Sequence, residues 1–339
     1  MTPAAYDLAD RFHQLAPWRW MNEISLIAID HPQSGRRDHI SIMGMAGNHY
    51  SLALYTGPVA RQRFNLMQTS EVDGKPIPHS ELAALILDTP QLQCSFSERG
   101  DLFKSELAAI KQAGKKYRGE NWPSFRNFRP GRCPIPANDE EVAWLCTAIE
   151  QVLEVAPTLE FGDDTLDYGQ NGPEILTRRF VNGEWRTEWT EDDRSLFEYP
   201  RPAADEFLLE KVRRHPNEVP LEAAFIMVPN PIGKSRETSV FPYFLLLVEP
   251  KSRLVVGHAV QSVETKSHEE LMDSIPTEFL RLCDRGSIRP ASIAVDSPAT
   301  HSLLTPMAKG LGIRCDLKKR LPALDQVFQS LLGFMGGGF

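Results

Sequence analysis

The spacing of apolar residues changes along the chain, and the N-terminal part contains both helical and strand-like stretches. Residues 4–15 repeat apolar positions at helical spacing. Residues 26–30, 40–42 and 52–55 are short apolar or alternating runs separated by turn-forming residues, a pattern typical of strands. This region therefore predicts one helix followed by a small antiparallel sheet.

Two further helices are expected before residue 160. The first covers residues 103–113, and an irregular stretch follows it. The second begins after Asn138, where Glu141 stands at the third helical position and completes a capping box. Apolar residues then recur at helical spacing as far as Pro157, which is expected to end the helix because proline has no backbone N–H. We expect the first domain to cover residues 1–160.

A β-hairpin is the clearest local signal in the middle of the chain. Residues 174–181 and 184–191 flank Asn182-Gly183, a dipeptide that supplies the two positive φ angles of a type I′ turn. Together with a proline-containing linker, the hairpin is expected to fill residues 161–203.

The two-residue loop fixes the register of this hairpin. It places Phe180 opposite Trp185 and Leu176 opposite Trp189, so one face is apolar and is expected to pack on a core. The opposite face carries polar side chains and is expected to be exposed: Thr177, Arg179, Arg186 and Glu188.

The C-terminal third has a readable order of elements, β-β-β-α-β-α-β-α. The strands and helices are expected, in chain order, at residues 223–228, 241–248, 254–263, 267–283, 291–295, 299–311, 313–317 and 322–332. Pro306 is expected to kink the second of these helices or to restart it after Thr305.

This order is that of RNase H-like domains. The predicted fold class is therefore mixed α/β and α+β: an N-terminal α+β domain, then an RNase H-like domain at residues 204–335 and a flexible tail at 336–339.

Two segments of the C-terminal third resemble retroviral-integrase and transposase cores. Residues 245–257 look like their second and third strands, and residues 289–296 look like their fourth strand, which ends at a catalytic Asp. The resemblance implies that Asp296 is that carboxylate.

A second resemblance covers nearly the whole chain. The motifs Trp18-x-Trp20, Tyr117-Arg-Gly and Arg320-Leu-Pro-Ala-Leu-Asp325 resemble those of bacterial proteins that are known only as domains of unknown function. This resemblance implies a two-domain layout and no activity.

The composition indicates a soluble protein of a reducing compartment. Forty-five acidic residues against 37 basic ones give a formal charge of −8, so any nucleic-acid contact must be local. The five cysteines are widely spaced and are expected to be buried free thiols. No signal sequence or membrane span is evident, and we expect a cytoplasmic protein.

An RNase H-type nuclease holds two metal ions with carboxylates from the first strand, the end of the fourth strand and a later helix. Asp296 occupies the second of these places, but residues 223–229 contain no carboxylate. Glu249 and Asp325 remain as candidates for a rearranged site. Asp296 also suits a turn before a helix, and Asp325 suits a helix N-terminus. Magnesium or manganese is expected only if such a site forms, and otherwise no cofactor is expected.

Residues 115–132 form the second candidate site. This segment holds six basic residues against Glu120 alone, with aromatic residues between them. Cations that follow phosphates and rings that stack on bases are typical of single-stranded nucleic-acid binding, although an acidic protein surface would also fit. Alternatively, the aromatic residues anchor a loop on the core. The candidate binding residues are Lys115, Lys116, Arg118, Trp122, Arg126, Arg129 and Arg132.

The sequence favours a non-enzymatic binding or accessory protein with a degenerate RNase H-like domain, because the first-strand carboxylate is missing. The alternative is a metal-dependent nuclease or a related phosphoryl-transfer enzyme.

Overall fold

The chain folds into two compact units in a computed structural model that describes residues 2–69, 71–72, 75–77, 79–161 and 173–334. The first unit consists of residues 1–68, 88–130 and 134–197, and the second of residues 69–87, 131–133 and 198–339. The chain therefore passes from one unit to the other more than once before residue 198. The predicted tail at residues 336–339 lies outside the described residues.

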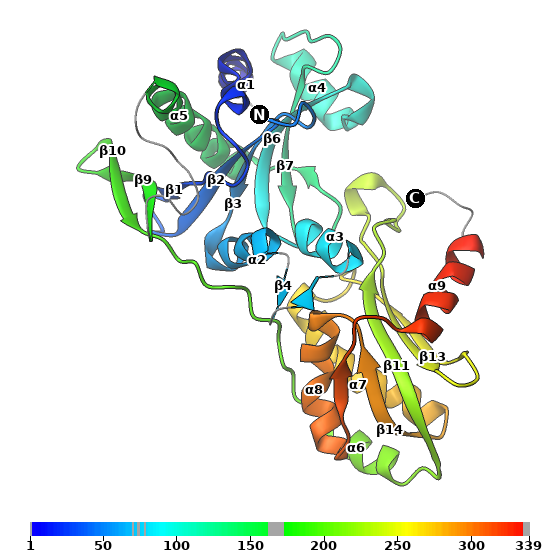
Figure 1. The fold of residues 1–339 in the computed structure, drawn as a ribbon. Coiled ribbons are helices and arrows are strands. Elements are labelled where there is room, and N and C mark those ends of the chain that lie inside the picture. Colours follow the sequence, from blue (N-terminus) through cyan, green and yellow to red (C-terminus); the bar gives the residue numbers. More distant parts are fainter. Residues whose placement is uncertain (1, 70, 73–74, 78, 162–172, 335–339) are drawn as a thin grey trace. The chain divides into compact units, whose positions relative to one another are not determined.

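The first unit is built on an eight-stranded sheet with the order β10-β9-β1-β2-β3-β6-β7-β8 (Figure 1). All neighbours are antiparallel except β1 and β9, which are parallel. The strands are β1 Ile27–Asp30, β2 Arg37–Met43, β3 Ser51–Tyr55, β6 Gln91–Ser97, β7 Trp122–Phe128, β8 Ile135–Pro136, β9 Glu174–Val181 and β10 Glu184–Glu191. The three predicted strands are confirmed, but the prediction of a small sheet was wrong.

Both faces of this sheet are covered. Helices α1 (Pro3–Leu15) and α5 (Asp139–Phe161) pack on one face, where Ile27 and Leu52 lie in the larger core. Helix α2 (Gly57–Thr69) packs on the other face through Ala60 and Phe64. Helix α4 (Lys104–Gln112) lies between β6 and β7 in the chain.

Helix α5 begins as predicted and ends later than predicted. Asn138 Oδ1 accepts a hydrogen bond from the Glu141 N–H at 2.9 Å, and Glu141 Oε2 accepts one from the Asn138 N–H at 2.9 Å, which confirms the capping box. The helix continues through Pro157 to Phe161, with the Thr158 hydroxyl donating to the Val155 carbonyl at 2.7 Å. By length and hydropathy alone this helix suffices to cross a membrane, but its apolar face is buried in the core of the first unit.

The hairpin β9–β10 has the predicted register and turn. Phe180 pairs with Trp185, Leu176 pairs with Trp189, and Asn182 has a φ of +53°. The prediction that the polar face is exposed was wrong for Thr177, which is fully buried. Thr177 pairs with Ala28 of β1, so β9 lies inside the first sheet and is covered there, while β10 forms the edge of the sheet.

The second unit is a mixed five-stranded sheet with helices, in the order β13-β12-β11-β14-β15. Strand β12 is antiparallel to β11 and β13, whereas β14 and β15 are parallel to β11. The strands are β11 Asn217–Met227, β12 Tyr243–Glu249, β13 Leu254–Gln261, β14 Ile288–Val295 and β15 Cys315–Leu317. The predicted order of elements is confirmed, but β11 begins earlier than predicted.

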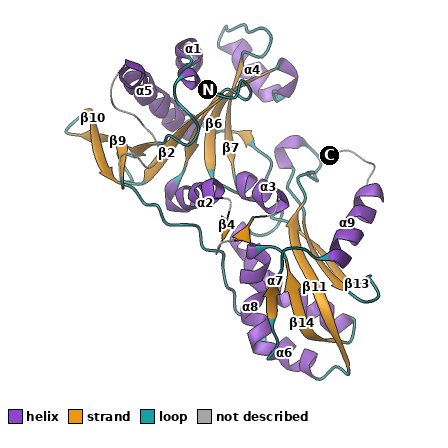
Figure 2. Ribbon diagram, viewed as in Figure 1, coloured by secondary structure: helices purple, strands orange, loops and turns teal. Residues whose placement is uncertain are grey.

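Helices lie on both faces of this second sheet (Figure 2). Helices α6 (Glu206–Arg213), α7 (His268–Arg285) and α8 (Pro298–Leu311) pack on one face, and α9 (Pro322–Phe334) packs on the other. Helix α8 is continuous through Pro306, so the predicted restart after Thr305 was wrong, and the Thr305 hydroxyl donates to the His301 carbonyl at 2.6 Å.

A segment from early in the chain completes the second unit. Residues 69–87 contain the two-stranded β4–β5 ribbon (Glu71–Val72 and Lys75–Pro76) and α3 (His79–Leu87), which packs against β11. The five cysteines are free thiols, as predicted, but only three of them are buried and two are partly exposed.

A buried ion pair joins α2 to the end of the hairpin in the first unit. Arg61 is 1% exposed, and its Nε donates to Asp192 Oδ1 at 3.1 Å while its Nη2 pairs with Asp192 Oδ2. His39 Nε2 lies 3.7 Å from Asp192 Oδ1. Arg61 and His39 hold the pKa of Asp192 at about 2 against the effect of burial, so the carboxylate is ionised wherever the protein is folded near neutral pH.

We expect Asp192→Ala to destabilise the protein by about 3–5 kcal/mol, because it leaves the Arg61 charge buried without its partner. Urea unfolding at pH 7 measures this free energy. The matched control is Glu188→Ala, which removes the exposed 3.2 Å pair with Arg179 and should cost less than about 1 kcal/mol. Equal losses in the two variants would contradict the assignment of this pair as a buried anchor.

Candidate functional site

The predicted basic segment is divided by the fold, because residues 122–128 form β7 inside the first sheet. Arg126 of this strand pairs with the buried Glu106 of α4 at 3.0 Å and donates to the Asp101 carbonyl at 2.7 Å. Arg129 pairs with Glu141 at 3.1 Å. These two guanidinium groups therefore have partners within the unit.

Two further predicted cations also have partners. Lys115 Nζ lies 2.6 Å from an oxygen of Asp7 and 2.8 Å from one of Asp10, both on α1. Arg132 belongs to the second unit, where it donates to the Val263 carbonyl at 2.7 Å. Of the six predicted cations, Lys116 and Arg118 are the two with neither an ion pair nor a side-chain hydrogen bond among the described residues, and Trp122 is the seventh predicted binding residue.

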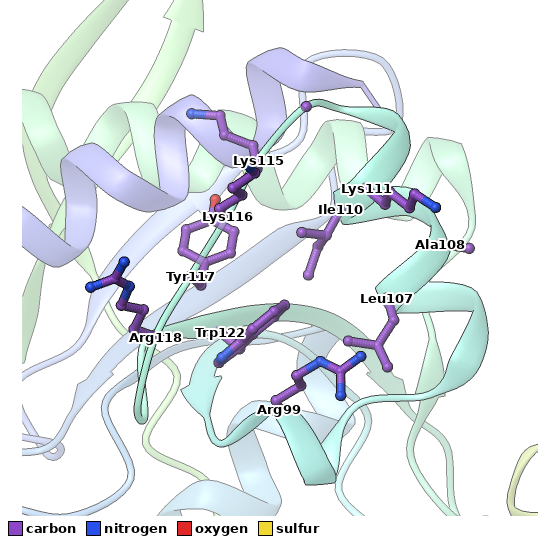
Figure 3. A pocket seen from close by; sticks show the side chains of 11 residues that line it. Arg99, Leu107, Ala108, Ile110, Lys111, Lys115, Lys116, Tyr117, Arg118 and Trp122 are labelled. Atoms are coloured by element: carbon purple, nitrogen blue, oxygen red, sulfur yellow. The ribbon is translucent and has the colours of Figure 1, made fainter.

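These three residues line a pocket of about 590 Å³ in the first unit (Figure 3). Five of its lining residues are cationic, and no acidic side chain is among the described residues that line it: Arg99, Lys111, Lys115, Lys116 and Arg118. Apart from Lys115, which Asp7 and Asp10 hold, these cations are exposed. Sequence reasoning missed Arg99 and Lys111, because they lie outside the basic segment.

The end of α4 builds this pocket. Gly114 has a φ of +72°, and its N–H donates to the Lys111 carbonyl while the Lys115 N–H donates to the Ile110 carbonyl, each at 3.1 Å. This is a Schellman motif, which turns the chain sharply after a helix. Residues 115–118 consequently run back beside α4, and Lys116 and Arg118 come to line the same pocket as Lys111.

The floor of the pocket is apolar and aromatic. The Tyr117 and Trp122 rings meet edge to face with centroids 5.8 Å apart, and the Arg99 guanidinium carbon lies 5.8 Å from the Trp122 ring centroid. Figure 3 shows Tyr117 and Ile110 above the Trp122 ring and Arg99 beneath it. Burial and the nearby Asp10 carboxylate raise the pKa of the Tyr117 hydroxyl, which therefore stays neutral.

The predicted carboxylates of the second unit are not all brought together. Glu249 closes the turn after β12, where it accepts hydrogen bonds from the Lys251 N–H at 3.0 Å and the Ser252 N–H at 2.6 Å. Val248 packs in the core beneath α9, so the adjacent Glu249 points to the opposite face of the sheet. Glu249 is therefore separated from the carboxylates on the α9 side.

Asp296 lies near enough to Asp325 and Glu222 for their charges to act on it. Burial raises the pKa of Asp296, and the negative charges of Asp325 and Glu222 raise it further. Glu222 is in the middle of β11, opposite Ala294 of β14, and is 8% exposed. The statement that the first strand lacks a carboxylate was wrong, because β11 begins at Asn217.

Glu222 has a structural role that its position explains. Its Oε2 accepts hydrogen bonds from the backbone N–H groups of Ala323 at 3.0 Å and Leu324 at 2.9 Å, in the first turn of α9. A carboxylate in this place satisfies N–H groups that the helix itself leaves free. Within the described residues, no group of three or more His, Cys, Asp and Glu side chains is arranged to hold a metal ion.

Two regions of the chain match known families. Residues 3–178, more than half of the chain, match the model of Domain of unknown function (DUF7309). The chain belongs to the DUF7309 family. Residues 208–332 match a second model, Domain of unknown function (DUF6930), and no curated protein matches the chain.

The two candidate sites fall in different matched regions. The cationic pocket lies wholly in the DUF7309 region, whereas Glu222, Asp296 and Asp325 lie in the DUF6930 region. Each matched region therefore contains one candidate site.

We expect Asp296→Asn to stabilise this DUF7309 protein at pH 7. The pKa of Asp296 is raised in the folded protein, so its protonated form favours folding and its ionised form opposes it. The stability that the protonated form contributes is lost as the pH rises through the folded pKa, and asparagine, which stays neutral, avoids this loss. The gain from the variant should therefore shrink as the pH falls and vanish below the ordinary Asp value of 3.8.

Urea unfolding between pH 4 and pH 8 measures this difference, with the exposed Asp273→Asn of α7 as the control that should show little change. A loss of stability in Asp296→Asn at pH 7 would show that the carboxylate is held by a favourable contact instead.

Proposed function

We propose that this DUF7309 protein is a non-enzymatic accessory protein that binds a polyanion at the pocket lined by Arg99, Lys111, Lys116 and Arg118. The observation that carries the proposal is a set of exposed cations with no ion pair among the described residues, on a chain with a formal charge of −8. Exposed cations without an acidic neighbour attract an anionic partner, and this attraction weakens as the salt concentration rises.

We further propose that the second unit is a degenerate RNase H-like domain. The sheet order β13-β12-β11-β14-β15 supports this proposal. Of the two neighbours of β11, β12 is antiparallel to it and β14 is parallel to it. The helices that follow β13, β14 and β15 also fit the order of such domains. In this scheme, Glu222 is a structural remnant that now fixes the start of α9.

The five free cysteines fit a protein that works in a reducing compartment, and we propose the cytoplasm.

Charge reversal at the pocket tests the proposed function. We expect Lys111→Glu, Lys116→Glu and Arg118→Glu together to weaken binding of a fluorescent (dT)20 or of polyphosphate at least tenfold at low salt. Each lost phosphate contact should also lower the slope of log affinity against log salt by about 0.7 for a single strand. Fluorescence anisotropy over a salt series measures both quantities.

The matched control changes net charge equally at three exposed cations that do not line the pocket: Arg11, Lys251 and Lys309, each changed to Glu. This control should keep most of the wild-type affinity. An equal loss in both triple variants would mean that only overall charge matters, and no binding of either polyanion at low salt would reject the proposal.

A metal-dependent nuclease is the second candidate, and Glu222 is the observation that favours it. A first-strand carboxylate is present after all, and its charge acts on Asp296 together with that of Asp325. Against this candidate, Glu222 is buried and Oε2 already accepts two backbone hydrogen bonds.

We expect no cleavage of single-stranded DNA or RNA by the wild-type protein in millimolar manganese. A gel assay of labelled oligonucleotides measures this, with EDTA as the blank. Manganese-dependent cleavage that is lost in Glu222→Gln and retained in Glu218→Gln, an exposed carboxylate of the same strand, would establish the nuclease and overturn the accessory role.

A further inference from the structure

We infer that the pocket takes single-stranded nucleic acid, with one unstacked base on the Trp122 ring and the adjoining phosphates on Lys111, Lys116 and Arg118. This inference rests on the proposed function and narrows its polyanion to one chemical class. What it adds is a reason for the aromatic and apolar floor.

A partner without bases would need only the cations. The floor beneath them is made of Leu107 and Ile110 from α4 together with Tyr117 and Trp122, and a phosphate gains nothing from such a surface. A nucleobase gains burial of its ring faces, and stacking on an aromatic side chain is tolerant of base identity. The combination of floor and cations therefore matches a nucleotide better than a sugar phosphate or a polyphosphate.

Trp122 is placed rigidly enough to act as a stacking platform. It is the first residue of β7, where it pairs with Ser97 of β6, and it is partly exposed to the pocket. Tyr117 meets it edge to face and holds the ring from one side, whereas Arg99 is an exposed side chain whose guanidinium carbon lies 5.8 Å from the ring centroid, so a stacking base can displace it. A pre-positioned ring loses little freedom when a base stacks on it.

The cations flank this ring instead of forming one cluster. Figure 3 shows Lys111 of α4 and Arg118 of the returning segment on opposite sides of the Tyr117 and Trp122 pair. A strand whose base enters the pocket can therefore place one phosphate on each side. A volume of about 590 Å³ is enough to admit one nucleotide.

The same base and phosphate could come from a free nucleotide or from a strand, and the assay separates them. Binding of the full-length protein is measured by competition against fluorescent (dT)12. The competitors are unlabelled (dT)12, a 12-residue abasic deoxyribose-phosphate strand, a 12-base-pair duplex, polyphosphate and dTMP.

We expect the wild-type protein to bind (dT)12 at least tenfold more tightly than the abasic strand, the duplex or dTMP. Trp122→Ala should remove this preference while leaving affinity for the abasic strand unchanged, and Trp122→Phe should retain most of it because the ring can still stack. The triple charge reversal should weaken binding of the abasic strand and (dT)12 alike. Circular dichroism and urea unfolding of each variant verify that it folds.

Equal wild-type affinity for (dT)12, the abasic strand and polyphosphate would overturn the inference and leave the proposed function standing. Failure of every polyanion to bind would reject the proposed function itself. Preference for the duplex, or dTMP binding as tight as (dT)12, would overturn the assignment to a single strand.

Discussion

The pairing of β7 with β6 is the constraint on which the candidate site depends. It takes residues 122–128 into the first sheet, with Cys94 opposite Phe125 and Ser97 opposite Trp122. Phe125 is then buried in the core, and Arg126 is directed to the Glu106 carboxylate of α4. The cations before the strand are left outside the sheet, and the Schellman motif at Gly114 returns them to α4. One segment thus contributes both to the core and to a cationic pocket.

The two units gather charge in opposite ways. In the first unit, cations surround an aromatic floor and are exposed, which leaves them available to an anion. In the second, carboxylates approach one another on the α9 side of the sheet, and burial raises the pKa of Asp296 and of Glu81. Glu81 accepts a hydrogen bond from the Ala299 N–H at the start of α8, as Glu222 does from α9. Glu81 and Glu222 therefore act as caps for α8 and α9.

The C-terminal elements were predictable because their strands are apolar and β-branched and their helices carry caps, so local pattern and fold agree. Strand β7 was missed because Pro123, Arg126 and Asn127 break any alternation, and their polar groups are satisfied by side chains far along the chain, such as Glu106 and Glu141. Glu222 was missed because the polar start of β11 does not look like a strand. The pocket itself was half predicted: Lys116, Arg118 and Trp122 belong to the basic segment, but Arg99 and Lys111 join them only through the turn after α4.

The central claim is that a base and its phosphates dock on the returning segment between α4 and β7. Hydrogen–deuterium exchange of the full chain with and without (dT)12 tests it most directly, because it locates the contact without any substitution. The account predicts slower amide exchange confined to residues 99–122. Protection confined to residues 295–300 and the start of α9, with none at residues 99–122, would contradict it.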